Sequence, residues 1–508
     1  MIVLSVLKNK KGKLKITKLL LVVVFAIILV NYIPLSKASL IDWDEGVFAL
    51  QSQWLASLGM QGKPFNFQTP PLYQMLVAGL FYIFRSKTFI LHLIALIASC
   101  LGVYLVFRLA SLLSSINDAI IAVFLFATSE FFLFFSKSGL SDAVFLCFFL
   151  ASVLFFFKGM KANKDTYFIF AGLFLALAAY TKYSAFPLLI SFFVIGMLDK
   201  KKINTKWFFF SIILPIILFA PYVLLMLRFI EFREIGTRHL SILGLNHFKF
   251  LIFLLIFAPS VLFLSLTHLL RNIRNMEKWN AYIFITILIF FLMLGFYYPY
   301  FRLAYPIVPL LAIPGAQFIG NLRRYKTLTT FAFILISLVF GFRTIEYLST
   351  VPEETGTFVH DIAVEADAKF IYAVVPPNVL YYINLEVVVP QGHPWELVGR
   401  IIPGFNKRKR IIKPKDICLP ADGKTILVHA TALDEIKKDY LDLYDNGILI
   451  SSFHFLDAPV YYKDVYNPQR NIQQLYEVYI IDNAALGEQL GNLWLFGFDR
   501  RVTVMFRK

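Results

Sequence analysis

The chain has 508 residues, of which 58% are apolar and only 16% are charged, so it lacks the polar surface that a soluble protein of this length needs. Up to Arg343 the chain carries 32 basic and 11 acidic residues, and beyond it 17 basic and 21 acidic ones. The basic residues form short clusters between apolar runs. This is typical of cytoplasmic loops and argues against nucleic-acid binding, which needs one basic face. Three cysteines, two of them inside apolar runs, predict no disulfide framework.

Eleven apolar runs are predicted to cross the membrane. They lie at about 19–35, 88–108, 117–135, 143–158, 166–181, 184–198, 207–227, 250–270, 280–298, 303–320 and 327–345. The first run follows six lysines and precedes SKAS at 36–39, so a cleaved signal peptide is the alternative there. The apolar stretch 70–84 is expected to be a juxtamembrane or re-entrant helix on the outer face, because counting it as a crossing would place the later basic clusters outside.

A cytoplasmic N-terminus puts every lysine and arginine cluster on the inner side of the membrane. The inner connections hold Arg108 and the clusters at 158–164, 200–206, 271–278 and 323–326. Between the runs 166–181 and 184–198, Thr181 and Lys182 are expected at an outer hairpin. The expected location is a prokaryotic cytoplasmic membrane, since the sequence carries no organellar address.

The same topology divides the chain into two predicted domains. Residues 1–345 form a polytopic α-helical membrane domain, which includes an outer juxtamembrane loop at 37–87. Residues 346–508 then lie outside the cytoplasm. Their composition differs, with strand-like runs at 370–375 and 425–429 and a helical stretch at 433–443, so a small α/β domain is predicted.

Acidic residues are rare in the membrane part, and their positions are therefore informative. Six of the eleven fall outside in this topology, among them Asp44, Glu45 and Asp142. Each of these acids also has a purely structural explanation, because the helix dipole favours an acid at a helix N-terminus close to water. Three acids together with nearby cations favour a functional site instead.

Several cations also lie outside, against the general trend. They include Lys63, Lys137, Lys182, Arg228, Arg233, Arg238, Lys249 and Arg302. Arg302 follows an aromatic run, YYPYF at 297–301, where its guanidinium could hold a phosphate bidentately or could simply extend to the interface in an aromatic belt. An acid pair with cations at the outer leaflet predicts a reaction on a lipid-borne, phosphate-linked substrate, with a carboxylate as general base and a cation that stabilises the departing phosphate.

The sequence contains no metal-binding, phosphate-loop or nucleophile-elbow motif, and the eight histidines have no metal-ligand spacing. Five short motifs occur instead: WDEG at 43–46, TPPLY at 69–73, SKSGLSD at 136–142, YTKY at 180–183 and RLAYPIVP at 302–309. With these motifs, residues 18–320 resemble the GT-C membrane glycosyltransferases. The resemblance is to the group of dolichyl-phosphate-mannose protein mannosyltransferases and aminoarabinose lipid A transferases, glycosyltransferase family 39-like.

This resemblance implies a GT-C fold of about 11 transmembrane helices and an inverting glycosyltransferase. The enzyme would move a hexosyl or pentosyl group from a polyprenyl-phosphate donor to a hydroxyl of a lipid, glycan or protein acceptor on the outer face. It implies that Asp44 is the base and that Glu45 organises the site. No cofactor or metal is implied.

The resemblance also assigns substrate-binding residues. Asp142 would orient a sugar, Arg302 would hold the carrier phosphate, and Tyr305 in the same motif and Lys137 would contact substrate. Thr69 stands where the group usually has a lysine. Lys63 or Lys182 is therefore expected to supply that phosphate contact.

Three other functions remain open. A GT-C oligosaccharide transferase would use a larger lipid-linked donor, and a non-catalytic GT-C protein would bind the carrier lipid or a partner. A transporter would be expected to carry ionisable residues or broken helices near the membrane midplane, whereas the unusual charges here lie at the outer surface.

Overall fold

The computed structural model describes residues 40, 43–60, 69–199, 205–227, 246–297, 300–322 and 325–350, together with six strands beyond them. The chain divides into two compact units. Unit 1 comprises Met1–Ser36, Phe67–Tyr73 and Leu91–Ile345, and unit 2 comprises Lys37–Asn66, Gln74–Ile90 and Glu346–Lys508. The predicted domains, 1–345 and 346–508, stay a prediction.

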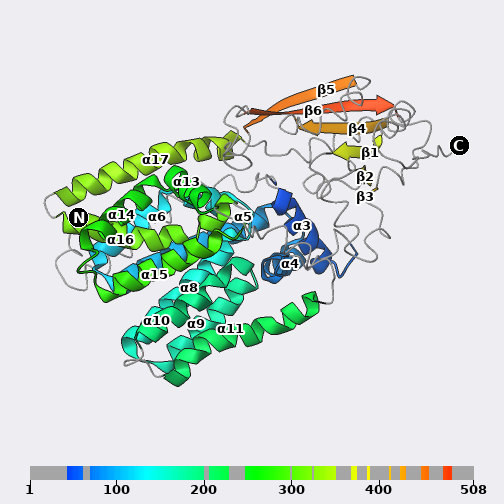
Figure 1. The fold of residues 1–508 in the computed structure, drawn as a ribbon. Helices are drawn as coiled ribbons and strands as arrows, with labels where there is room; N and C mark the ends of the chain where they lie inside the picture. Colours follow the sequence, from blue (N-terminus) through cyan, green and yellow to red (C-terminus); the bar gives the residue numbers. More distant parts are fainter. Residues whose placement is uncertain are drawn as a thin grey trace, which may run out of the picture. The chain divides into compact units, whose positions relative to one another are not determined.

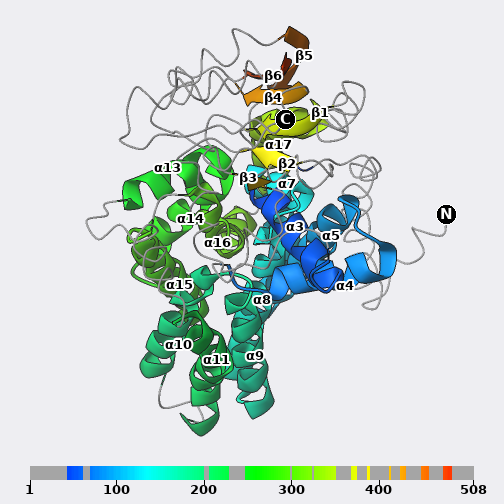
Figure 2. The same cartoon turned by 90° about the vertical axis from the view of Figure 1, so that its right-hand side faces the viewer.

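Helices form over the apolar runs, because a backbone in lipid must satisfy its hydrogen bonds within its own segment. In chain order they are α3 (Trp43–Ala56), α4 (Leu72–Phe84), α5 (Phe89–Leu113), α6 (Ile116–Ala127), α7 (Glu130–Lys137), α8 (Asp142–Ala162), α9 (Asp165–Ala179), η3 (Tyr183–Ala185), α10 (Pro187–Leu198), α11 (Thr205–Met226), α13 (His247–Phe257), α14 (Pro259–Asn272), α15 (Lys278–Leu294), η5 (Phe301–Ala304), α16 (Ile307–Asn321) and α17 (Lys326–Thr350). Helices α9, α10 and α11 lie side by side (Figures 1 and 2).

Three of the described helical segments are long and apolar enough to cross a membrane alone: α5, α8 and Phe208–Met226 of α11. The pairs α6–α7 and α13–α14 pass the same test together but are bent by 66° and 113°. Six shorter apolar segments occur as well, and the count of eleven spans stays a prediction. The expected run 19–35 lies outside the described residues.

Local chemistry explains the breaks in the two bent pairs. Ser129 caps α7, since its hydroxyl accepts a hydrogen bond from the N–H of Phe132 at 3.4 Å. Pro259 opens α14 and has no N–H to continue the ladder of α13. The expected single span 250–270 is therefore a broken one. Helix α4 has 13 residues, or roughly 20 Å, which is too short for a bilayer core.

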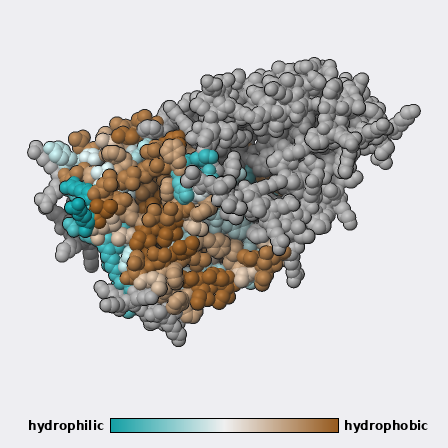
Figure 3. Space-filling view, viewed as in Figure 1, coloured by the Kyte–Doolittle hydropathy of each residue, from teal (hydrophilic) through white to brown (hydrophobic). Residues whose placement is uncertain are grey.

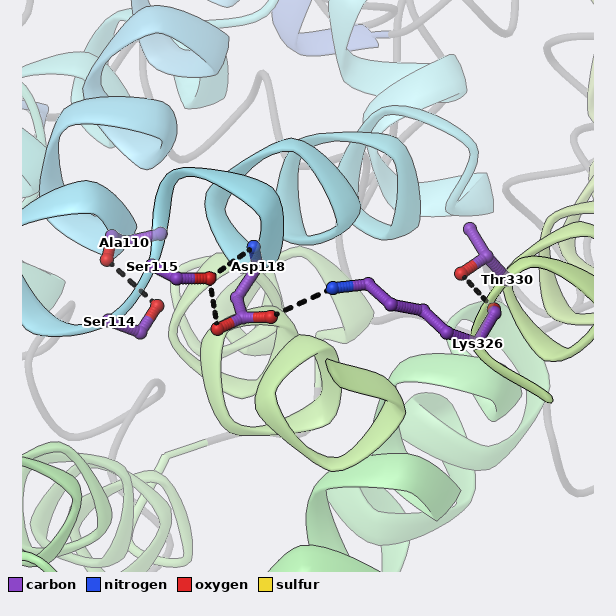
Figure 4. A network of polar contacts seen from close by, with 6 residues as sticks. All are labelled: Ala110, Ser114, Ser115, Asp118, Lys326 and Thr330. Atoms are coloured by element: carbon purple, nitrogen blue, oxygen red, sulfur yellow. Dashed lines mark hydrogen bonds and ion pairs between the residues drawn. The ribbon is translucent and has the colours of Figure 1, made fainter. Parts of the chain in front are cut away.

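Ion pairs join helix ends that the charge pattern assigned to one side. Lys326 at the start of α17 lies 3.5 Å from Asp118 in α6, a carboxylate that Ser115 also contacts (Figure 4). Lys278 at the start of α15 forms an ion pair with Asp199 at the end of α10. All four charged residues were expected on the inner side. The structure is thus consistent with the predicted alternation of these helices, whereas which side faces the cytoplasm stays a prediction.

The bent pair α13–α14 still runs from one end of α15 to the other. The side chain of Asn246, just before α13, donates to the carbonyl of Tyr297, just after α15, at 3.0 Å. At the other end, His268 in α14 lies 3.4 Å from Asn280 in the first turn of α15. The pair therefore traverses the helical layer despite its bend.

Phenylalanine rings fill much of the interior of unit 1. Phe131 of α7 lies 5.2 Å from Phe257 of α13, and Phe135 lies 5.4 Å from Phe301 of η5. The stacked pair Phe257 and Phe301, 5.0 Å apart, joins them into one cluster. Figure 3 shows apolar residues over most of the described surface on the visible face, with hydrophilic residues gathered along one edge.

A six-stranded sheet lies in unit 2, in the order β3-β2-β1-β4-β6-β5 (Figure 1). The strands are β1 (Ala368–Ala373), β2 (Glu386–Val388), β3 (Ile411–Ile412), β4 (Lys424–Ala430), β5 (Ile448–Leu456) and β6 (Gln473–Asp482). Strands β1 to β4 are parallel, and β6 is antiparallel to both β4 and β5. Strands β1 and β4 cover most of the two runs expected as strands. The expected helix 433–443 lies outside the described residues, and the α/β domain stays a prediction.

Candidate active site

A buried ion pair lies at the end of unit 1 that was predicted to face outward. Asp142 is the first residue of α8, and Lys182 directly precedes η3. The Lys182 Nζ lies 2.6 Å from Asp142 Oδ1, and the side chains are 16% and 2% exposed. Because α9 ends at Ala179 and η3 begins at Tyr183, the expected break around Lys182 is confirmed. The structure thus brings together two predicted substrate-binding residues.

The carboxylate of Asp142 has capacity for a further partner. The helix N-terminus favours its negative charge, and Lys182 neutralises it. Its second oxygen, Oδ2, is buried and forms no hydrogen bond to the described part of the chain. Buried polar atoms are normally satisfied, so this oxygen fits a site that takes a donor group from a ligand or water.

Lys137 lies close to this pair in sequence, at the last position of α7. Its carbonyl oxygen is 2.7 Å from Nδ1 of His92 in α5, and since a carbonyl only accepts, Nδ1 carries the hydrogen. The side chain of Lys137 is half-buried. Helices α7 and α8 are joined by residues 138–141, so one short loop carries both Lys137 and Asp142.

The segment 69–73, with the sequence TPPLY, contacts the same elements. The N–H of Leu72 donates to the carbonyl of Tyr180 at 3.0 Å, and the Tyr222 hydroxyl of α11 donates to the carbonyl of Thr69 at 2.9 Å. The hydroxyl of buried Tyr73 donates to the carbonyl of Gly139 at 2.5 Å. Three of the short motifs, far apart in sequence, therefore meet at one end of unit 1.

Tyr305 is fully buried beside the aromatic cluster, with its ring 4.7 Å from that of Phe135. It lies between η5 and α16. Its hydroxyl forms no hydrogen bond to the described residues. Asp142 lies near enough to Tyr305 for its charge to act on the phenol, whereas the substrate-binding role of both residues stays a prediction.

The remaining predicted residues are less closely tied to this cluster. Arg302 in η5 is half-buried, with its guanidinium carbon 5.3 Å from the centre of the Tyr300 ring. Asp44 and Glu45 lie in the first turn of α3, where Glu45 is fully buried and Asp44 half-buried. These two acids belong to unit 2, and their roles stay predictions. Lys63 lies outside the described residues.

Sequence reasoning missed Tyr222 and His92. Each is a polar side chain in a largely apolar helix, and such a group needs a hydrogen-bond partner when it is buried. This signal was present in the sequence. It does not reveal the partner, however, since Tyr222 contacts a carbonyl 153 residues away along the chain. Among the described residues, no group of three or more His, Cys, Asp or Glu side chains is arranged to hold a metal ion.

The comparisons with known proteins agree with the motifs. The sequence profile of the dolichyl-phosphate-mannose-protein mannosyltransferase family matches residues 68–225. No curated protein matches the chain by sequence. The matched region includes Lys137, Asp142 and Lys182.

Solved structures of low sequence identity share the fold. ArnT from Cupriavidus metallidurans in the apo state has a TM-score of 0.65 at 13% identity, over 92% of this chain and 98% of that one. The same protein bound to undecaprenyl phosphate has a TM-score of 0.62 at 12% identity, with the same coverage. The oligosaccharyltransferase of Archaeoglobus fulgidus in the apo form has 0.54 at 10%, over 84% of this chain and 71% of that one. The chain thus has a GT-C membrane fold and resembles the mannosyltransferase and ArnT group, as the motifs predicted.

Proposed function

We propose that the protein is an inverting glycosyltransferase. It moves a sugar from a polyprenyl-phosphate donor to a hydroxyl of a lipid, glycan or protein acceptor at the outer face of a cell membrane. The observation that carries the proposal is the ion pair of the buried Asp142 with Lys182, at one end of a GT-C helical unit, with Lys137 on the loop that leads to Asp142. The similarity in fold to a protein that binds undecaprenyl phosphate supports a polyprenyl carrier.

Cations at this end suit the phosphate of the donor. A lysine ammonium has three N–H donors, so Lys182 can hold the Asp142 carboxylate and a phosphate oxygen together. Lys137 and Arg302 would add charge-assisted hydrogen bonds, with Lys63 as a further candidate. Such donors stabilise the negative charge that builds up on the phosphate as it leaves.

The transfer step then needs a base on the opposite face of the sugar. The acceptor oxygen attacks the anomeric carbon, the bond from that carbon to the phosphate oxygen breaks, and the configuration inverts. Asp44 takes the hydroxyl proton, while Glu45 organises the site. Asp142 Oδ2 and the Tyr305 hydroxyl, both buried and without a partner among the described residues, would bind donor or acceptor groups. The products are a glycoside and a polyprenyl phosphate.

The test uses the full chain, purified and returned to lipid, with a panel of polyprenyl-phosphate sugars. Transfer of labelled sugar and release of polyprenyl phosphate are measured for the wild type, for Asp44→Asn and for Asp165→Asn. Asp165 is a matched control, because it also lies in the first turn of a helix but at the end predicted to face inward. We expect one donor to be used, and Asp44→Asn to lose at least about 100-fold in kcat while Asp165→Asn retains activity.

The other outcomes separate the alternatives. If Asp44→Asn stays within about threefold of the wild type, Asp44 is not the base. Turnover only with lipid-linked oligosaccharides would favour an oligosaccharide transferase, a reading that the fold similarity to the archaeal oligosaccharyltransferase supports. Donor binding without any transfer would indicate a non-catalytic carrier-binding protein, and flux of a solute across the membrane would indicate a transporter.

A further inference from the structure

We propose that Tyr73 and Tyr222 are positioning residues, which hold the 69–73 segment as a bridge between the two structural elements that carry the phosphate-binding cations. This inference rests on the proposed function, since it assigns these cations to the phosphate of a polyprenyl carrier. The bridge sets the position of Lys182 relative to the loop that carries Lys137 and Asp142.

One side of the bridge is fixed close to Lys182. The carbonyl of Tyr180, two residues before Lys182, accepts the N–H of Leu72 at 3.0 Å. The Tyr222 hydroxyl holds the other end of the segment through the carbonyl of Thr69 at 2.9 Å. Because Tyr222 lies on α11 and Tyr180 caps α9, the segment is anchored to two helices on this side.

The other side of the bridge is fixed to the loop 138–141. Gly139, whose carbonyl accepts the Tyr73 hydroxyl, lies two residues after Lys137 and three before Asp142. Tyr73 is fully buried, so water does not compete with its hydrogen bond. A movement of this loop would shift Lys137 and Asp142 together.

The sequence of the segment suits a rigid bridge. Pro70 and Pro71 have fixed φ angles and no N–H groups, so the segment loses little conformational freedom when it is held. The three hydrogen bonds come from both ends of five residues and reach three separate elements: α9, α11 and the loop between α7 and α8. Removing one hydroxyl would loosen the link without removing a cation.

The experiment compares Tyr73→Phe and Tyr222→Phe with Ser260→Ala. Ser260 of α14 is a matched control, since its buried hydroxyl also donates to a backbone carbonyl of another helix, that of Phe333 in α17 at 3.2 Å, and does not bond to the segment. We measure the Kd for undecaprenyl phosphate, and KM and kcat for the donor. The cations bind the phosphate in the ground state and also stabilise the charge that builds up on it as it leaves. Kd and KM are therefore expected to rise about three- to tenfold, and kcat is expected to fall by up to about the same factor. Ser260→Ala is expected to match the wild type.

Amide hydrogen exchange tests whether the 69–73 segment is held by these hydrogen bonds, and it needs no activity assay. Peptides over 69–73 and 138–142 are expected to exchange faster in Tyr73→Phe and Tyr222→Phe, and at the wild-type rate in Ser260→Ala. Unchanged Kd and exchange in the first two variants would overturn the inference, as would a fall in thermal stability with no change in Kd. A wild type that binds undecaprenyl phosphate but transfers no sugar would contradict the proposed function alone. A wild type that does not bind it would contradict both.

Discussion

The side chains of Asp142 and Lys182 differ in their exposure to water. This difference determines how much the removal of each charge lowers the free energy of unfolding. The side chain of Asp142 is 2% exposed, whereas that of Lys182 is 16% exposed. An ammonium near the surface can move its flexible stem toward water when its partner is removed. The buried carboxylate of Asp142 cannot reach water in this way, so its charge stays buried and unpaired.

The first prediction is therefore an asymmetry between the two single variants. Lys182→Met is expected to lower the free energy of unfolding by about 3 kcal/mol, because it leaves the Asp142 charge buried and unpaired. Asp142→Asn is expected to lower the free energy of unfolding by less, because the Lys182 ammonium that it leaves unpaired is closer to water. The double variant, with neither charge, is expected to recover part of the loss caused by Lys182→Met. Thermal unfolding in detergent measures all three, and equal losses in the two single variants would contradict the argument.

Two of the three anchors of the 69–73 segment lie on α11 and at the end of α9, and these two helices approach closely at one glycine. A Cβ added at Gly172 of α9 would lie 2.6 Å from the carbonyl oxygen of Phe210 in α11. That atom is part of the backbone and cannot rotate away, so the helices would have to separate. The close approach of small residues is a common basis for helix packing in membranes, where the hydrophobic effect does not hold helices together.

The second prediction follows from this contact. Gly172→Ala is expected to destabilise unit 1 by about 1–3 kcal/mol through overpacking. Gly102→Ala in α5 is the matched control, since a Cβ there meets no atom within 4 Å and alanine favours a helix. The expected result is a lower Tm for Gly172→Ala and an equal or higher Tm for Gly102→Ala. Similar Tm values for both variants would show that α9 and α11 can shift without cost.

Motif order predicted the GT-C fold, and the sidedness that the charge pattern indicates stays a prediction, whereas neither predicted the contacts within the site. Sidedness depends on which connections carry lysines and arginines, and this can be counted along a chain. The pairing of Asp142 with Lys182 depends on how α8 packs against α9, which composition does not encode. The bend at Ala258 illustrates an intermediate case: Pro259 can break a helix, yet the apolar run 250–270 continues through it and by itself predicts one span.

The last prediction tests the number of crossings and their direction together. In a variant whose three native cysteines are replaced by alanine, single cysteines are placed at the exposed positions Lys87, Asn163 and Asn275. Three predicted crossings separate Lys87 from Asn163, and four separate Asn163 from Asn275. In intact cells, a membrane-impermeant maleimide is therefore expected to label Lys87→Cys, and to label Asn163→Cys and Asn275→Cys only after the cells are permeabilised.

Each departure from this pattern has a distinct meaning. If Asn163→Cys and Asn275→Cys are labelled in intact cells and Lys87→Cys is not, the protein has the opposite orientation in the membrane, with the predicted number of crossings between these positions. A label on Asn275→Cys but not on Asn163→Cys would mean an odd number of crossings between them. The bent pair α13–α14 would then be a re-entrant loop, against the contacts that join its two ends to opposite ends of α15. Arg302, which follows α15, would move to the cytoplasmic side, where it could not hold a phosphate beside Lys182.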